Sequence, residues 1–227
     1  MSAATESKKP LTVVFCLPGR SFERRFLLSW TTLFAACLQR GIAIKIAQEY
    51  SSVVHFARAK CLGGDVLAGK HQVPFQGTLD YDYIMWIDSD VVFKPDDFFA
   101  LLESPHPVTA GYYMMEDDTH VATVENWDID FFLKNASFKF LTVEDIKARK
   151  ERYIPVSYTG MGWMLIRRGA IERIEYPWFY RPAEVIGGKV IDMASDDVAF
   201  CKNLMDAGVP IMLDTQVRVG HIKNRVL

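Results

Sequence analysis

The chain has 227 residues, of which 50% are hydrophobic, and a formal net charge of −2 from 26 basic and 28 acidic residues. This length and apolar content allow one large domain with a sizeable core. The near balance of charge gives no long-range field that would attract a polyanion, so nucleic acid is not an expected partner.

The polar residues 1–10 predict a disordered tail that precedes a single domain at residues 11–227. No segment contains the roughly 18 uninterrupted apolar residues that a membrane span needs, and the tail lacks the apolar run of a signal peptide. We therefore expect a soluble, cytoplasmic protein without a membrane span. The four cysteines lie singly in apolar stretches, which predicts buried free thiols. They are Cys16, Cys37, Cys61 and Cys201.

The chain then begins with a strand, a helix and a second strand. The apolar run at residues 11–17 predicts a strand that Pro18-Gly19-Arg20 ends in a tight loop. Apolar side chains recur at helical spacing over residues 22–38, and Gly41 is placed to cap that helix. Residues 42–47 predict the next strand. This order favours a parallel sheet with right-handed crossovers.

The same alternation continues into the middle of the chain. Ser51 or Ser52 can cap a helix that runs to about Leu67. Residues 83–87 are almost wholly apolar, as in a strand that is buried on both faces of a sheet. Asp88 follows at the point where this strand leaves the core.

The second half is less regular. Helices are predicted at residues 95–102, at residues 142–150 with a weak Thr142–Asp145 capping box, and from an N-cap at Ser195 to about Ala207. The β-rich runs predict short strands. These runs are residues 108–115, 121–125, 154–158, 163–167, 211–213 and 216–219. Without a repeat or a linker, the pattern indicates one α/β domain with a central mixed, mainly parallel sheet flanked by helices.

Asp88-Ser89-Asp90 is the first candidate for a metal-binding or catalytic site. On a chain that is still extended, the two carboxylates would point to the same side at the end of a central strand, where α/β sheets bind their ligands. Carboxylate oxygens suit Mg²⁺ or Mn²⁺, which can neutralise a diphosphate. The alternative is a polar exit from a buried strand, because an isolated Asp-x-Asp is a weak motif.

With Asp-x-Asp directly after Tyr83-Ile84-Met85-Trp86-Ile87, the chain resembles the GT-A glycosyltransferases over residues 11–221, and most nearly the small soluble ones of large algal viruses and some bacteria. The resemblance implies a Rossmann-like nucleotide-binding half at residues 11–103 and an acceptor-binding, catalytic half at residues 104–227. It implies sugar transfer from a nucleotide diphosphate donor, with a UDP-sugar favoured, to a hydroxyl group on a glycan or glycoprotein. It also implies inversion and a Mn²⁺ or Mg²⁺ cofactor.

The resemblance assigns a role to each part of the metal site. Asp90 would be a direct metal ligand, Asp88 would reach the ribose or the metal through water, and His221 would be the third protein ligand. Ser89 would lie at the donor between them. A single histidine that follows a glycine can equally be a structural imidazole.

Two further features would contact the nucleotide. The backbone amides of Pro18-Gly19-Arg20, at the start of a helix, can receive a base, ribose or phosphate. Arg58 resembles an arginine that many family members place near the nucleotide, and arginine pairs well with phosphate oxygens. The alternatives are an ordinary tight turn and a solvated helix face.

Gly160, Gly162 and Trp163 resemble the glycine-containing segment that lies under the donor sugar in this family. Missing side chains would let a sugar approach the backbone, and Trp163 would offer a flat apolar face to it. The alternative is a hairpin turn beside a core tryptophan.

Asp196 and Asp197 resemble the acidic pair that supplies the general base in inverting members, where the family usually has Glu-Asp. A carboxylate there could take the proton from the acceptor hydroxyl, and Asp197 is favoured. The alternative is that two acids in the first turn simply stabilise a helix dipole.

Two other functions compete with glycosyl transfer. A sugar-phosphate nucleotidyltransferase shares a Rossmann-like sheet and bound Mg²⁺, but residues 17–21 are a poor version of its glycine-rich basic loop. A catalytically silent module that binds nucleotide sugars or glycans is the second alternative. Residues 127–150, which mix aromatic and charged side chains, would form a lid or face the acceptor.

Overall fold

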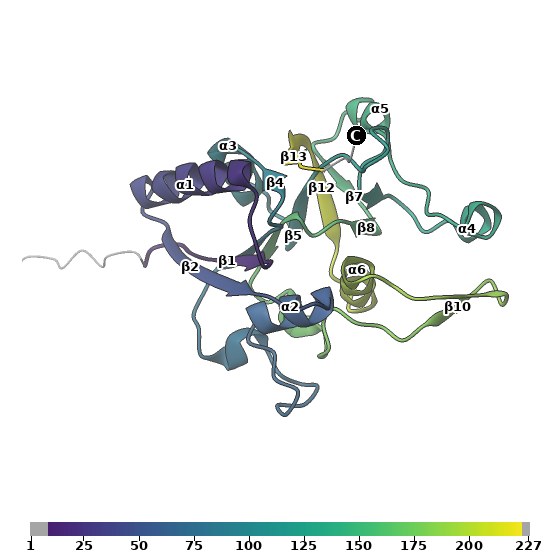
Figure 1. The fold of residues 1–227 in the computed structure, drawn as a ribbon, viewed down its shortest axis with the longest axis horizontal. Helices are drawn as coiled ribbons and strands as arrows, with labels where there is room; N and C mark the ends of the chain where they lie inside the picture. Colours follow the sequence, from purple (N-terminus) through teal and green to yellow (C-terminus); the bar gives the residue numbers. More distant parts are fainter. Residues whose placement is uncertain (1–8, 224–227) are drawn as a thin grey trace, which may run out of the picture.

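Seven strands form the central sheet of the computed structural model, which describes residues 9–223 (Figure 1). Across the sheet their order is β2-β1-β3-β9-β5-β12-β7, and all strands except β9 and β7 run in the same direction. The predicted α/β class with a mixed, mainly parallel sheet is confirmed. The strands are β1 (Thr12–Pro18), β2 (Ala43–Glu49), β3 (Tyr83–Ile87), β5 (Val108–Tyr112), β7 (Tyr153–Pro155), β9 (Trp163–Arg167) and β12 (Ile211–Arg218).

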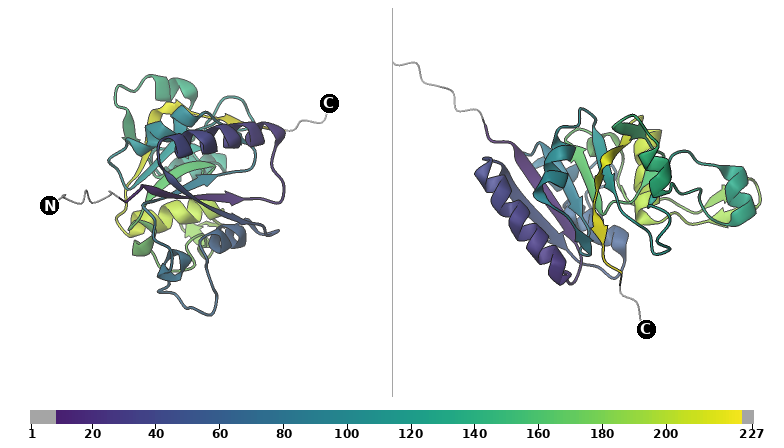
Figure 2. Two further views of the ribbon diagram at one scale, coloured as in Figure 1. Left: turned by 90° about the vertical axis from the view of Figure 1, so that its left-hand side faces the viewer. Right: turned by 90° about the horizontal axis from the view of Figure 1, so that it is seen from above.

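Helices cover both faces of this sheet (Figures 1 and 2). The helices of the described residues are α1 (Arg24–Gln39), α2 (Val54–Cys61), α3 (Pro95–Leu102), α4 (Ile129–Asn135), α5 (Val143–Lys147) and α6 (Asp196–Asp206), with short 3₁₀ turns at Pro74–Gly77 and Ile171–Arg173. Of these, α4 lies away from the sheet. Alternate residues of β1 enter two different cores, as the pleat of a strand requires. Phe15 packs in the core that includes residues of α1 and α3, and Cys16 packs in the core that includes residues of α2 and α6.

Three two-stranded pairs extend the architecture. They are β4 (Val91–Val92) with β13 (Gly220–His221), β6 (Thr123–Val124) with β8 (Tyr158–Thr159), and β10 (Glu184–Ile186) with β11 (Val190–Asp192). The pair β4–β13 brings Gly220 and His221 beside the residues that follow β3.

The helix predicted to run to Leu67 is shorter than expected. Val53, not Ser51 or Ser52, occupies the N-cap position, and α2 ends at Cys61. Gly63 takes a φ of 68°, and its N–H and that of Gly64 bond the carbonyls of Lys60 and Ala59 at 2.8 Å each. This is a Schellman-type end, which stops the helix at the first glycine.

Other differences lie in the second half. The run at residues 154–158 divides into β7 and β8, and the two runs at residues 211–219 form one irregular strand, β12. Helix α4 and the β10–β11 hairpin were not predicted.

The four cysteines are free and buried as expected. Most of the predicted tail at residues 1–10 lies outside the described residues. Among residues 9–223, none of the helices has the length and apolarity that crossing a membrane requires.

Candidate functional site

A cavity of about 280 Å³ lies at the carboxyl ends of β1, β2 and β3. This is where ligands collect in open α/β sheets. Most of the predicted donor residues line it, together with four that the sequence did not indicate. The predicted ones are Pro18, Gly19, Arg20, Arg58, Asp88, Ser89 and Asp90, and the added ones are Tyr50, Ser51, Val54 and Ala57.

The loops after β1 and β3 are fixed against each other. Gly19 has a φ of 153°, and a Cβ on it would lie 3.1 Å from both Cβ and Oγ of Ser89. The Glu23 N–H also donates to the Ser89 carbonyl at 3.0 Å. A glycine is therefore required at position 19 by a close approach of protein backbone and side chain.

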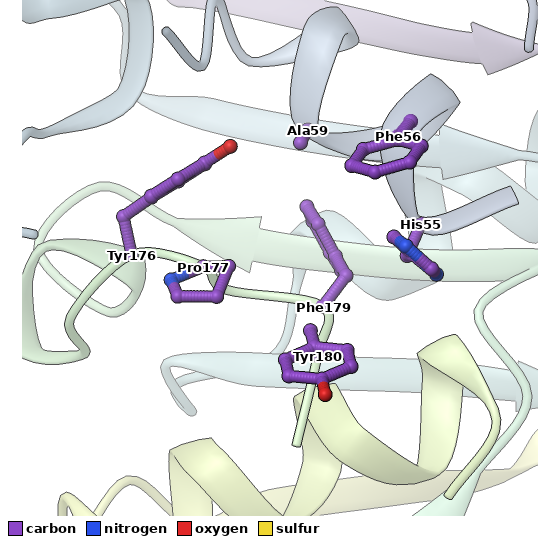
Figure 3. Close-up of a pocket in the computed structure, with 7 residues that line it drawn as sticks. All are labelled: His55, Phe56, Ala59, Tyr176, Pro177, Phe179 and Tyr180. Carbon is purple, nitrogen blue, oxygen red and sulfur yellow. The ribbon is translucent and has the colours of Figure 1, made fainter. Parts of the chain in front are cut away.

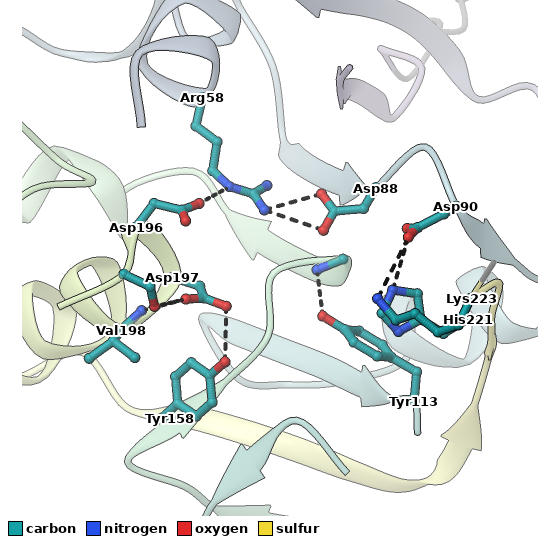
Figure 4. Close-up of polar contacts among 12 residues, drawn as sticks. Arg58, Asp88, Asp90, Tyr113, Tyr158, Asp196, Asp197, Val198, His221 and Lys223 are labelled. Carbon is teal, nitrogen blue, oxygen red and sulfur yellow. Dashed lines mark hydrogen bonds and ion pairs between the residues drawn. The ribbon is translucent and has the colours of Figure 1, made fainter. Parts of the chain in front are cut away.

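Arg58 joins two parts of the site (Figure 4). It is buried, and its Nε donates to Asp196 Oδ2 at 2.5 Å while its Nη2 lies 3.1 Å from Asp88 Oδ1. Burial alone would lower the pKa of Arg58, but the charges of Asp88 and Asp196 raise it, so the guanidinium stays cationic. Its Nη1 is buried without a hydrogen-bond partner among the described residues. Leaving a charged donor unpaired inside a protein costs free energy.

The two carboxylates of Asp88-Ser89-Asp90 have different partners, although both residues line the same cavity. The chain turns here, since the Val91 N–H donates to the Asp88 carbonyl at 3.1 Å, so Asp88 faces Arg58 and Asp90 faces His221 (Figure 4). The expectation of an extended chain was wrong. Burial raises the pKa of Asp88, against the opposing charge of Arg58.

Asp90 and His221 meet through the β4–β13 pair, in which His221 lies opposite Val91. His221 Nε2 is 3.1 Å from Asp90 Oδ2, and Nδ1 is 3.2 Å from the Met114 carbonyl. A carbonyl can only accept, so Nδ1 carries a proton, and Nε2 faces the carboxylate. Burial raises the pKa of Asp90, but the hydrogen bond from His221 and the charges of His221 and Lys223 outweigh it and lower that pKa.

Within residues 9–223, His, Cys, Asp and Glu side chains form no group of three that could hold a metal ion. Asp90 and His221 supply two ligand atoms of suitable types, a carboxylate oxygen and an imidazole nitrogen. Asp88 is engaged by Arg58 and does not join them. The residues therefore fit a metal ion whose other ligands come from a bound diphosphate and water.

The acidic pair at the start of α6 also separates. Asp196 binds Arg58, whereas Asp197 Oδ2 accepts a 2.9 Å hydrogen bond from the Tyr158 hydroxyl (Figure 4). Ser195 occupies the N-cap position, but its hydroxyl donates to Asp197 and makes no cap bond to the backbone. Burial, followed by the charge of Asp197, raises the pKa of Tyr158, which keeps its hydroxyl a donor.

Glycine occupies positions 160 and 162 for a different physical reason from the one that we expected. A Cβ on Gly160 would lie 2.1 Å from the Tyr113 hydroxyl oxygen, and one on Gly162 would lie 3.0 Å from it. These glycines therefore make room for Tyr113, which also accepts a 3.2 Å hydrogen bond from the Gly162 N–H. Trp163 is fully buried, with its ring 4.5 Å from that of Phe93, so it does not offer a sugar the exposed face that we expected.

Three tyrosines of the site were missed. Tyr113 directly follows β5 and contacts His221, Tyr50 directly follows β2 at the cavity, and Tyr158, the first residue of β8, bonds Asp197. Tyr113 and Tyr50 come just beyond the end of a strand, and Tyr158 ends the strand that was predicted at residues 154–158. That position is the signal that the sequence offered for them, but tyrosine is equally common in strands for packing alone.

A second cavity, of about 290 Å³, lies between α2 and the segment 176–180 (Figure 3). Aromatic rings dominate its wall, including Phe56, Phe179 and Tyr180. None of the predicted site residues lines it, so it is separate from the site described above.

No protein-family model matches this chain, and a search of curated proteins finds no significant match. Among solved structures it is similar to A197 from STIV, with a TM-score of 0.55 and 17% identity over 94% of this chain and 87% of that one. Weaker similarity links it to GalNAc-T7 with UDP, GalNAc and Mn²⁺ (TM-score 0.49, 13% identity, 96% of this chain and 45% of that one). A Drosophila β1,4-galactosyltransferase 7 mutant in complex with manganese, UDP-Gal and xylobiose follows (TM-score 0.46, 15% identity, 95% of this chain and 72% of that one).

At these identities the likeness to A197 shows a shared fold alone. The strand order β2-β1-β3 forms a Rossmann-like first half, and Asp88-Ser89-Asp90 leaves β3 at its carboxyl end. The α/β fold with a Rossmann-like first half that was expected from the sequence is therefore the fold of this chain.

Proposed function

We propose that this chain is a metal-dependent glycosyltransferase that moves a sugar from a nucleotide diphosphate donor, with a UDP-sugar favoured, to a hydroxyl group of a glycan or glycoprotein, with inversion. The observation that carries the proposal is the cavity beyond β1, β2 and β3. Its wall combines Arg58, which has a buried N–H without an acceptor, with Asp90, which is paired to His221. A guanidinium with a spare N–H is a fitting partner for a phosphate oxygen.

Different residues of this cavity contact different parts of the donor. Gly19 and Arg20 receive the nucleoside, and the Tyr50 ring, with the Arg20 guanidinium 6.0 Å from its centre, offers a face for the base. Arg58 binds the oxygens of the diphosphate. Asp88, which Arg58 holds in place, receives the ribose.

Asp90 and His221 are the residues that would hold Mn²⁺ or Mg²⁺. The bond from His221 Nδ1 to the Met114 carbonyl fixes the ring with Nε2 toward the site, as is typical of metal-binding histidines. When bound, the ion supplies positive charge that stabilises the departing diphosphate.

Asp197 is the proposed general base. Its carboxylate takes the proton of the acceptor hydroxyl while that oxygen bonds to the anomeric carbon and the bond from this carbon to the diphosphate breaks. Tyr158 positions Asp197 through its 2.9 Å hydrogen bond. Asp196 is engaged by Arg58 and is the weaker candidate for this role.

A thermal-shift panel of nucleotide sugars, with and without Mn²⁺, tests the proposal. We expect a diphosphate donor to raise the melting temperature only when the metal is present, because a ligand that binds the native state stabilises it. Transfer assays with the same donor should lose activity in Asp90→Ala. Pyrophosphate release from a nucleoside triphosphate and a sugar phosphate would instead indicate a nucleotidyltransferase. Donor binding without hydrolysis or transfer would indicate a silent binding module.

A further inference from the structure

Two segments project from the sheet as one arm, formed by α4 with its flanking residues 126–138 and by the β10–β11 hairpin (Figures 1 and 2). They contact each other at the far end, where a Cβ on Gly187 of the hairpin would lie 2.6 Å from Leu133 Cδ1 of α4. Between the two segments lies a cavity of about 260 Å³, which we call the arm cleft.

The arm cleft has an aromatic wall and a charged rim. The ring of Phe138 lies 5.1 Å from that of Trp127 and 5.2 Å from that of Phe132, and all three line the space. At the rim, Lys202 Nζ lies 2.5 Å from Glu184 Oε2 and 5.5 Å from the centre of the Trp127 ring. Apolar faces beside fixed polar groups are the arrangement by which pockets orient a polar ring.

The arm cleft leads to the proposed general base. The Trp127 ring is 6.3 Å from the Tyr158 ring, and Tyr158 donates to Asp197. Phe138 and Lys202 also line a narrow continuation of the cleft that reaches Val198, the neighbour of Asp197 in the first turn of α6. The aromatic wall of the cleft is therefore linked to Asp197 through the Tyr158 side chain.

We infer that the arm cleft binds a sugar ring of a carbohydrate acceptor, with its apolar face stacked on Trp127 and its hydroxyl groups bonded to Asp128 and Glu184 at the rim. This inference rests on the proposed function. Sugar rings present both an apolar face and many hydroxyl donors, and carboxylates are strong acceptors for those donors. An alkyl chain could use the aromatic wall but has no hydroxyl group to donate to the carboxylates of the rim.

An array of immobilised oligosaccharides, probed with the full chain in the presence of UDP and Mn²⁺, tests the inference. The wild type should be retained by a subset of glycans, and Trp127→Ala should reduce retention at least tenfold. Val185→Arg is the second variant, because Val185 is 64% exposed and lines the cleft, so a longer side chain there blocks the space without touching the core. Phe56→Ala, in the separate aromatic cavity, is the matched control and should bind glycans like the wild type.

The increase in melting temperature that UDP with Mn²⁺ gives to the same variants distinguishes the inference about the arm cleft from the proposed function. If the wild type is stabilised but is retained by no glycan, or if both cleft variants keep the wild-type retention, the inference is wrong while the donor site stands. If UDP and Mn²⁺ fail to stabilise the wild type, the proposed function is the part that fails.

Discussion

The imidazole of His221 lies 3.1 Å from the carboxylate of Asp90, although 131 residues separate them along the chain. His221 Nδ1 donates to the Met114 carbonyl, so Nε2 is the ring nitrogen that faces Asp90. The fold thus brings a carboxylate oxygen and an imidazole nitrogen from two distant parts of the chain side by side.

His221→Ala should remove the metal dependence of donor binding. At a concentration of about 100 times Kd, a ligand that binds only the native state contributes about 2.7 kcal/mol to the free energy of unfolding. We expect the part of this that requires Mn²⁺ to be lost in the variant, as measured by thermal unfolding with UDP in the presence and absence of Mn²⁺. His55→Ala, in the separate aromatic cavity, is the control and should respond like the wild type. An unchanged Mn²⁺ response in His221→Ala would exclude this residue as a ligand.

Arg58→Ala should destabilise the fold as well as abolish donor binding. Its removal leaves Asp88 and Asp196, which it now bridges, without a partner in a largely buried setting. Breaking a buried ion pair from one side typically costs about 3–5 kcal/mol, to be read from urea unfolding. Arg168→Ala is the matched control: its side chain is 50% exposed where it pairs with Asp80, so the loss should stay below about 1 kcal/mol. Equal effects of the two variants would contradict the bridging role.

The first half of the fold could be predicted from the sequence because its signals are local. Continuous apolar runs mark β1 and β3, and Gly41 marks the end of α1. The end of α2 was missed because Gly63 stops the helix while apolar residues continue to Leu67.

The arm could not be predicted for a different reason. Helix α4 has only seven residues, none of them buried, and its contact partner, Gly187, is 54 residues from Leu133 (187 − 133). The different roles of Asp88 and Asp90 likewise depend on distant partners, Arg58 and His221. Residue types near a strand end predicted the location of the site, and tertiary contacts decided what each side chain does there.

The ion pairs of Glu184 should make stability depend on pH. The hydrogen bond from Lys202 lowers the pKa of Glu184 most, against burial and with help from Arg181. A carboxyl whose folded pKa is depressed contributes stability above its unfolded pKa, near 4.3, and loses it as pH falls through the folded value. The melting temperature of Glu184→Gln should therefore lie below that of the wild type at neutral pH and converge with it on acidification. A constant gap down to pH 2 would contradict this, and high salt should narrow the neutral-pH gap.

Gly160→Ala should destabilise the protein through Tyr113. The new Cβ would lie 2.1 Å from the Tyr113 hydroxyl oxygen and 2.9 Å from Cζ, so the ring must move within a buried site. Overpacking of this kind costs about 1–3 kcal/mol. Tyr113→Phe removes the oxygen, so the double variant should be more stable than the sum of the two single effects predicts. Strict additivity in urea unfolding would show that the glycine is required for another reason.

Asp197→Asn should separate chemistry from donor binding. An amide keeps the shape of the side chain and can still contact Tyr158, but it does not accept the acceptor proton. Loss of a general base lowers kcat by about 10²–10⁴. Donor stabilisation in the presence of Mn²⁺ should stay at the wild-type level, because Asp197 lies outside the group of residues that line the donor cavity.

Asp196→Asn should affect donor binding and stability more than kcat. The substitution weakens the 2.5 Å contact to Arg58, so donor affinity and the free energy of unfolding should fall, while the rate of the donor-bound complex changes less. If Asp196→Asn rather than Asp197→Asn removes turnover at saturating donor, the base is Asp196, and the contact between Arg58 and Asp196 must then open during the reaction.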